Sequence, residues 1–256
     1  MANYNSMELM ICVAAQEIQD GASAVVGTGA PCAVGMLAQK TVAPNLLMLF
    51  EAGGVAPLLP TMPVSVGDSR TFYKGIMASS MTETMTLAAR GMVDYAFLGG
   101  AQLDMYGNLN SSMIGNDYRH PKVRLPGSGG AADLATNCWR IVVITPHEKR
   151  RFVEKVDFIT SPGYLTGGNS RYDAGLPIGG GPYRIITNLA IMDFEEKSKR
   201  MRVISLHPGV TLEQVKENTG FELLVKEPLS TTKEPSSEML RILREEVDPE
   251  KYIIGR

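Results

Sequence analysis

The chain has 256 residues, 44% of them hydrophobic, and 25 Lys and Arg against 27 Asp and Glu give it a formal net charge of −2. A chain of this length buries enough surface to fold without disulfide or metal staples. Near-balanced charge disfavours nucleic-acid binding, which needs a basic stripe to release phosphate counterions. The apolar runs also fall short of the roughly 18–20 residues that span a bilayer, so we expect neither nucleic acid nor membrane as a partner.

Cysteine and histidine usage indicates a reduced protein without a metal site. The three cysteines form an odd, widely spaced set, and no CxxC or HxxxH spacing occurs, which leaves zinc little support. Because the first residues also lack the basic and apolar segments of a signal peptide, we expect a cytoplasmic location. Glycine is the one unusual count, with 26 residues, or about 10% of the chain against a usual roughly 7%.

The first half of the chain alternates helical and extended patterns. Apolar residues at helical spacing predict the first helix, and a near-continuous apolar run that ends at Glu51 is typical of a strand covered on both faces. A glycine-rich turn follows each expected strand. The expected elements, in chain order, are a helix over 7–18, a strand over 23–26, a helix over 33–43, a strand over 46–50, a helix over 71–90 and a strand over 95–98.

The second half begins with a glycine-rich segment over 106–132, which we expect to be an ordered functional loop region, as long loops in compact domains usually are. A capping box at Thr211–Gln214 predicts a helix over 212–218, and a second capped helix should run from Ser236 or the next residue to Val247. The expected strands are 140–144, 156–159, 184–187, 190–194 and 201–206.

Strands that alternate with helices as near-continuous apolar runs predict an α/β fold, with a mostly parallel sheet and helices on both faces. The lack of a linker or repeat favours a single domain over 1–256. In open parallel sheets, ligands bind beyond the carboxyl ends of the strands, so we expect the site at the glycine-rich strand ends.

One interpretation of these strand ends is dinucleotide binding. Gly27 and Gly29 open a turn into a helix, and Glu51 lies 22 residues after Gly29, where an acid that binds ribose belongs. The third glycine of that fingerprint is replaced by Cys32, whose side chain spoils the close packing of helix on strand that glycine permits. The match is therefore incomplete.

The other interpretation makes Glu51 the reactive group. A carboxylate can attack a thioester and form a mixed anhydride, which splits one difficult step into two easier ones. The small residues Ala52, Gly53 and Gly54 let the backbone turn sharply and a long acyl-thioester approach, so Gly53 and Gly54 are candidate substrate-binding positions. An exposed glutamate in an ordinary turn is the plain alternative.

Two further segments could serve such a carboxylate. The small-residue turn Leu125–Asp133 offers backbone N–H groups that could face a developing oxyanion, with a tight surface turn as the alternative. Asn108 and Asn110 could orient a substrate, although a Gly-Asn pair is first of all turn chemistry. Cys32 and Cys138 are most simply buried small hydrophobic residues.

At these positions the sequence resembles the B subunits of the class I (family I) CoA-transferases and is most like the glutaconate CoA-transferase type. Glu51 matches the catalytic glutamate of that family, while Ala52 replaces the serine or asparagine that follows it there. The similarity keeps the same order over most of the chain. The matching stretches are Val42–Gly53, Ser65–Asp68, Gly99–Gln102, Tyr106–Ser111, His120–Lys122, Gly127–Ala131, His147–Phe152 and Thr160–Gly163.

The resemblance implies a NagB/RpiA/CoA-transferase-like fold and ping-pong transfer of CoA between an acyl-CoA and a free (di)carboxylate. Glu51 would attack the acyl-CoA and then carry CoA as a glutamyl thioester, with Gly129, Gly130 and Gln102 as oxyanion elements. No permanently bound cofactor or metal is implied, since coenzyme A is a cosubstrate. An A subunit would complete the active site in a heterotetramer or larger assembly.

Other functions stay open. Relatives in the same superfamily hydrolyse cyclic β-keto acyl-CoA rings or decarboxylate an acyl-CoA, and His207–Thr211 resembles the ring-opening hydrolase branch. A non-catalytic subunit that only binds acyl-CoA is a third hypothesis, against which Glu51 and its glycines argue. The charged run His147–Arg151 could contact a CoA phosphate or the partner subunit, but a solvated charged turn is the simpler expectation.

Overall fold

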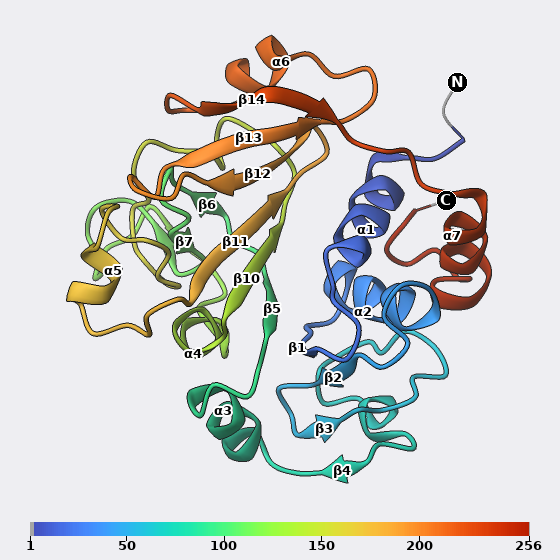
Figure 1. Ribbon diagram of the computed structural model, residues 1–256. Helices are drawn as coiled ribbons and strands as arrows, with labels where there is room; N and C mark the ends of the chain where they lie inside the picture. Colours follow the sequence, from blue (N-terminus) through green and yellow to red (C-terminus); the bar gives the residue numbers. More distant parts are fainter. Residues whose placement is uncertain (1–2, 256) are drawn as a thin grey trace. The chain divides into compact units, whose positions relative to one another are not determined.

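The structure, a computed structural model, describes residues 3–255, and the contacts within the chain separate two units (Figure 1). Unit 1 consists of the described residues up to Phe97 and from Glu234 onward, and unit 2 consists of residues 98–233. Both units combine parallel strands with helices, as expected of an α/β fold. The single-domain count stays a prediction.

Unit 1 is built on a parallel core of strands. β1 (Ser23–Val25) lies between β2 (Leu47–Leu49) and β5 (Tyr95–Leu98), and both neighbours run parallel to it. β3 (Gly54–Val55) and β4 (Met77–Ala78) continue this sheet beyond β2 as antiparallel strands. Every residue of β1 and β5 is buried, which agrees with the apolar runs in the sequence.

The helices of unit 1 begin where the sequence supplies caps. The Asn5 side chain accepts the N–H of Glu8, and the Glu8 carboxylate accepts the N–H of Asn5, which forms a capping box for the first helix. The helices α1, α2 and α7 pack against one another. The bounds are α1 Ser6–Gln16, α2 Ala30–Lys40, α3 Met81–Ala89 and α7 Ser237–Ile242, with a 3-10 turn over Ser69–Phe72 and a π-helical turn over Leu243–Val247.

Unit 2 contains a sheet in the order β14-β13-β12-β11-β10. The outer pairs β10–β11 and β13–β14 are parallel, while β11–β12 and β12–β13 are antiparallel. The strands are β10 Arg140–Ile144, β11 Gly181–Ile186, β12 Ala190–Phe194, β13 Met201–Leu206 and β14 Leu224–Thr231. The helices are α4 Ala131–Asn137, α5 Ser170–Asp173 and α6 Leu212–Glu217.

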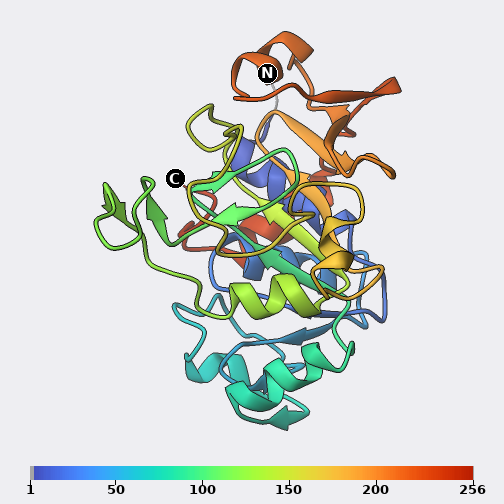
Figure 2. The ribbon, with the colours of Figure 1, turned by 90° about the vertical axis from the view of Figure 1, so that its left-hand side faces the viewer.

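The glycine-rich segment of unit 2 folds as two small hairpins. β6 (Gln102–Leu103) pairs with β7 (Leu109–Asn110), and β8 (Met113–Ile114) pairs with β9 (Val123–Arg124). The β8–β9 hairpin extends away from the sheet of this unit (Figure 2). Short strands, turns and the start of α4 thus occupy a segment in which the sequence predicts ordered loops.

The predicted helix over 71–90 is correct only in its second half, which contains α3. The 3-10 turn ends at Phe72, β4 pairs with β3, and α3 begins only at Met81. Ser80 accepts the N–H of Glu83 and the Glu83 carboxylate accepts the N–H of Ser80, so this capping box starts the helix in the middle of the predicted span. A local cap outweighs helical spacing here.

In unit 2, one predicted strand is wrong and one observed strand was not predicted. Residues 156–159 form no strand, because the N–H of Asp157 donates to the Gln102 side chain instead of to a neighbouring strand. The sequence pattern misses β14, whose charged residues and Pro228 break the apolar alternation. Proline is tolerated there since β14 lies at the edge of the sheet. Among residues 3–255, no helix has the length and apolar character needed to cross a membrane.

Candidate active site

Glu51 lies in a tight turn that follows β2 in unit 1. The N–H of Gly53 donates to the Phe50 carbonyl oxygen at 2.9 Å, and the N–H of Phe50 donates to the Gly54 carbonyl oxygen at 2.9 Å. Gly53 has φ +116°, a backbone conformation that favours glycine. Phe50 is buried and Glu51 is half-buried, so the turn brings the carboxylate to the surface directly after a core strand.

Close packing of neighbouring backbone explains why positions 53 and 54 are glycine. A Cβ atom on Gly53 would overlap the Ser79 carbonyl oxygen, and one on Gly54 would overlap the Thr71 carbonyl oxygen. Neighbouring backbone therefore packs directly against the turn. The N–H of Gly53 is committed to the turn itself, and a direct role of these glycines in binding substrate stays a prediction.

The segment before α3 holds the same turn from the other side. The Gly53 carbonyl oxygen accepts hydrogen bonds from both the N–H and the hydroxyl of Ser79, each at 2.9 Å. The Thr84 side chain is fully buried, and its hydroxyl lies 3.4 Å from the Phe50 carbonyl oxygen. Sequence reasoning missed Ser79 and Thr84, although the capping box at Ser80 marks this segment.

The Glu51 carboxylate has no hydrogen-bond or ion-pair partner among residues 3–255. Hydrogen bonds or a cation would stabilise the charged form and reduce its tendency to attack an electrophile. The structure thus presents a carboxylate with free lone pairs on a turn anchored by backbone contacts. Such a group is suited to act as a nucleophile.

Gln102 and Asn110 meet in one buried network of unit 2. The Asn110 amide donates to the Gln102 side-chain oxygen at 2.7 Å and to the Met113 carbonyl at 2.6 Å, and its oxygen accepts the N–H groups of Ser112 and Met113. Asn110 therefore has no donor or acceptor left for a ligand. Gln102 also accepts from Asp157 N–H and donates to the Asp157 carboxylate, which leaves one N–H of its amide.

Gly129 and Gly130 form the turn that leads into α4. The N–H of Ala131 donates to the Ser128 carbonyl oxygen at 2.9 Å, and Gly129 has φ +49°. Within the described part of the chain, the N–H groups of Gly129 and Gly130 have no hydrogen-bond partner. Two adjacent unpaired N–H groups are suited to stabilise an oxyanion.

A buried arginine supports the far end of α4. Arg171 is fully buried, and its guanidinium donates to the carbonyl oxygens of Ala135, Pro162 and Gly163 at 2.8–3.0 Å. Burial lowers the pKa of Arg171, and no carboxylate pairs with it among the described residues. Arg171 therefore joins the last turn of α4 to the segment around Gly163. Sequence reasoning missed this residue, which lies in a glycine-rich stretch.

The charged run His147–Arg151 is only in part the solvated turn that the sequence predicts. His147 is buried, stacks on Phe152 with ring centroids 3.9 Å apart, and shares hydrogen bonds with the hydroxyls of Thr187 and Thr219. Burial lowers the pKa of His147 to about 4. Arg150, by contrast, is exposed.

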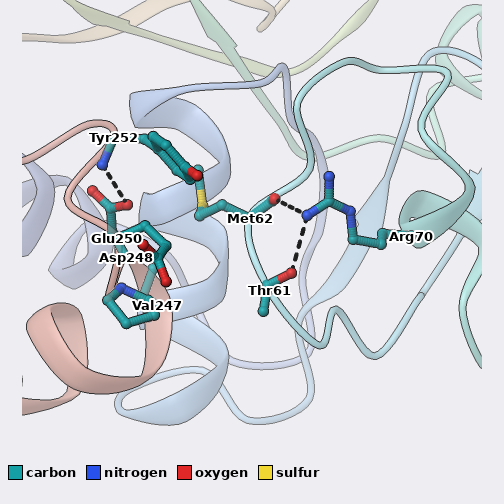
Figure 3. A pocket seen from close by; sticks show the side chains of 8 residues that line it. Thr61, Met62, Arg70, Val247, Asp248, Glu250 and Tyr252 are labelled. Carbon is teal, nitrogen blue, oxygen red and sulfur yellow. Dashed lines mark hydrogen bonds between the residues drawn. The ribbon is translucent and has the colours of Figure 1, made fainter.

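The turn with Gly27 and Gly29, which the sequence offers as a possible dinucleotide-binding turn, lies beside the C-terminal segment of unit 1. A Cβ on Gly29 would lie 3.9 Å from the Ile253 side chain. A neighbouring cavity of about 370 Å³ is lined by Arg70, Asp248 and Tyr252 (Figure 3). The Asp248 carboxylate accepts three backbone N–H groups, so this cavity offers few free polar groups. Cys32 and Cys138 are buried, as predicted.

The predicted site residues thus form three groups. Glu51, Gly53 and Gly54 share one turn in unit 1. Gln102 and Asn110 share one hydrogen-bond network in unit 2, and Gly129 with Gly130 forms a separate turn of the same unit. The first group offers a free carboxylate, and the last offers free backbone donors.

Comparison with known proteins identifies relatives along nearly the whole chain. The family model for coenzyme A transferase matches residues 8–218. The chain is 40% identical to the B subunit of 3-oxoadipate CoA-transferase from Pseudomonas knackmussii, over 95% of this chain and 94% of that protein. It is 37% identical to the B subunit of glutaconate CoA-transferase from Acidaminococcus fermentans, over 98% and 96% of the two chains.

Solved structures give the same result. The crystal structure of glutaconate coenzyme A-transferase from Acidaminococcus fermentans superposes with a TM-score of 0.93 at 35% identity, over 99% of this chain and 98% of that one. A more distant relative, the cholesterol ring-cleaving hydrolase IpdB subunit of Mycobacterium tuberculosis, is 31% identical over 83% and 82% of the two chains. The chain therefore belongs to the coenzyme A transferase family, within which it is similar to the B subunits.

Proposed function

We propose that this chain is the glutamate-bearing B subunit of a heteromeric CoA-transferase and that Glu51 is its nucleophile. The observation that carries the proposal is the free Glu51 carboxylate on a tight turn after β2, in a chain that belongs to the coenzyme A transferase family. Coenzyme A is then a substrate. CoA moves from an acyl-CoA to a free (di)carboxylate, and the donor acyl group is released as its own carboxylate.

The reaction proceeds through two enzyme-bound intermediates. A Glu51 oxygen attacks the thioester carbonyl carbon, the carbon–sulfur bond breaks, and CoA leaves as a thiolate beside a mixed anhydride. The thiolate then attacks the Glu51 carbonyl carbon and releases the donor acid as a carboxylate, which leaves a glutamyl-CoA thioester. The acceptor carboxylate runs the same steps in reverse. One negative charge is carried throughout, so the balance needs no added proton or oxidant.

Each tetrahedral intermediate places negative charge on a former carbonyl oxygen. Unpaired N–H groups suit this charge, and the Gly129–Gly130 turn supplies two of them. Gln102, the third oxyanion candidate, has one N–H left, and because Gln102 lines a separate pocket we leave it out of the oxyanion site. The relatives are named as B subunits, which supports an A-type chain as the partner, in a heterotetramer or larger assembly that completes the active site.

Borohydride inactivation tests the proposal. The purified complex is incubated with acyl-CoA, treated with borohydride and assayed for CoA exchange. A glutamyl-CoA thioester would be reduced to an alcohol, so activity should be lost only when acyl-CoA is present. Inactivation by hydroxylamine should show the same dependence. Equal survival with and without acyl-CoA would contradict the proposal.

Hydrolysis of a cyclic β-keto acyl-CoA is the second candidate function, and the similarity to the ring-cleaving hydrolase subunit supports it. The chain is less similar to this hydrolase subunit than to the CoA-transferase subunits, because the sequence identity is lower and the matched segment is shorter. A decarboxylase, AibA/AibB, shares the fold at 25% identity. An assay without an added acid separates these functions: a transferase stalls after about one turnover, whereas a hydrolase or decarboxylase consumes its substrate.

A further inference from the structure

A pocket of unit 2 lies between Gln102 and the turn that follows β10. It has a volume of about 290 Å³ and is lined by Ala101, Gln102, Ile114, Arg150 and Arg151. These residues come from β6, from β8 and from the turn after β10. Two arginines and one amide therefore converge on a space large enough for a phosphoryl group.

The polar groups that line this pocket are mainly hydrogen-bond donors with unused capacity. Arg150 uses only its Nε, and Arg151 uses Nε and Nη1, so the remaining guanidinium nitrogens have no partner in the described chain. The Gln102 amide keeps one N–H, while its oxygen is occupied by Asn110 and Asp157. A pocket with free donors and occupied acceptors favours an anion.

The net charge of the turn after β10 also favours an anion. Glu148 accepts the Nε groups of both arginines through one oxygen, at 2.6 Å from Arg150 and 3.2 Å from Arg151. These three side chains together carry one net positive charge, and the exposed Lys149 adds another. Glu148 also orients the two guanidinium groups, which limits the freedom that they would lose when a ligand binds.

The backbone under the arginines is well anchored. Leu103 N–H donates to the Arg151 carbonyl at 2.7 Å, and Val153 N–H donates to the Leu103 carbonyl at 3.0 Å. Beneath this segment, Phe152 is fully buried and stacks on His147. A rigid turn with two exposed or half-exposed arginines is a preorganised anion site rather than a mobile charged loop.

We propose that the pocket formed by Gln102, Arg150 and Arg151 binds a phosphoryl group of coenzyme A. This rests on the proposed function only in that CoA is the ligand. Guanidinium groups match phosphate oxygens in geometry, and a tetrahedral phosphoryl group can accept from three side chains that approach from different directions, whereas one fork satisfies a planar carboxylate. The phosphoryl group belongs either to the diphosphate or to the 3′-phosphate of CoA.

Isothermal titration calorimetry of the complex with its A-type partner tests the pocket without turnover. CoA, 3′-dephospho-CoA and pantetheine are titrated into wild type, Arg150→Gln, Arg151→Gln and the control Lys149→Gln, which changes the same charge in the same turn outside the pocket. We expect each arginine substitution to raise the Kd for CoA about tenfold, the loss of one charge-assisted hydrogen bond, and to leave the Kd for pantetheine within about twofold.

The three ligands separate the outcomes. A loss that persists with 3′-dephospho-CoA assigns the pocket to the diphosphate, and a loss that disappears assigns it to the 3′-phosphate; both support the proposal. Unchanged CoA affinity in both arginine variants, an equal loss with pantetheine, or an equal loss in Lys149→Gln would overturn it. A wild-type complex without affinity for CoA would instead contradict the proposed function.

Discussion

The Glu51 turn of unit 1 and the buried polar residues of unit 2 use hydrogen bonds in opposite ways. In the turn, the anchoring bonds go to backbone groups of Phe50, Gly53 and Gly54, and the Glu51 carboxylate keeps its lone pairs. In unit 2, the side chains themselves make the bonds, and Asn110 has every donor and acceptor occupied. A reactive side chain needs support that does not consume its own polar atoms.

The same difference distinguishes polar residues with a role in the reaction from polar residues that support the fold, although both kinds are equally conspicuous in the sequence. Asn108 joins the Asp104 carboxylate to backbone groups of Gly163 and Leu165, and it is fully buried. Together with Asn110 and Arg171 it forms what we call the polar frame of unit 2. Substitutions in the turn should therefore lower activity, and substitutions in the frame should lower stability.

Replacement of Glu51 should have the largest effect. Glu51→Ala removes the nucleophile, and we expect exchange to fall by about 10⁴-fold or more with no change in the free energy of unfolding. Glu51→Asp moves the carboxylate back by one methylene and should lose about 100-fold. Initial rates of CoA exchange and urea unfolding of the same preparations measure both quantities. A Glu51→Ala complex that transfers at the wild-type rate would refute the mechanism.

Arg171→Met should be the most destabilising change in the frame. It leaves the carbonyl oxygens of Ala135, Pro162 and Gly163 without their donor, which we expect to lower the free energy of unfolding by about 4 kcal/mol. Urea denaturation followed by circular dichroism measures the change. The matched control is Arg241→Met, an arginine that is 44% exposed. Similar losses in the two variants would argue against the framework role.

Acid should destabilise the folded chain through the buried His147. Its pKa is about 4 in the folded chain against 6.5 ordinarily, because burial disfavours the cation. Below pH 6.5, His147 binds a proton in the unfolded chain but not in the folded chain. The free energy of unfolding therefore falls between pH 6.5 and 4 and then levels off. The drop corresponds to about 3 kcal/mol. His207, whose pKa burial also lowers, acts in the same direction.

Replacing His147 isolates its share of this pH dependence. In a His147→Asn variant, the loss of unfolding free energy between pH 6.5 and 4 should be smaller than in wild type by about 3 kcal/mol. Urea midpoints at half-unit pH steps give the two curves. Parallel curves for wild type and variant would show that His147 is not the group that titrates.

Ser79→Ala should have the smallest effect and should act on turnover. It removes the hydroxyl bond to the Gly53 carbonyl but keeps the backbone bond of the same residue. We expect kcat to fall about fivefold with KM nearly unchanged, since the carboxylate is less well oriented. Thr86→Ala removes a hydroxyl that bonds within α3 and serves as the control. Equal effects in the two variants would remove Ser79 from the support of the turn.

Local signals in the sequence predict much of the fold and the position of Glu51. The apolar run before Glu51 and the two glycines after it describe β2 and its turn correctly. The capping box at Thr211 starts α6 as predicted. The helix prediction fails before α3, because the capping box at Ser80 starts the helix later than the sequence pattern indicates. Ser79 and Thr84 could not be identified from the sequence, because they contact the Glu51 turn only in the tertiary structure.

The sequence could not show which polar side chains have all their hydrogen-bonding atoms occupied. Asn110 looks like a site residue until Gln102, Ser112 and Met113 are seen to use its polar atoms. His147 belongs to a charged run, yet only that residue turns inward to Phe152. The cytoplasmic location and the lack of a permanent cofactor stay predictions.

Mass spectrometry of Glu51 itself tests the central claim most directly. The complex is mixed with acyl-CoA in the absence of an acceptor acid, quenched in acid and digested. We predict that the peptide containing Glu51 gains the mass of CoA minus water, and that hydroxylamine converts this adduct to a hydroxamate at Glu51. Continued CoA exchange with an unmodified Glu51 peptide, or with the adduct on another residue, would contradict the account.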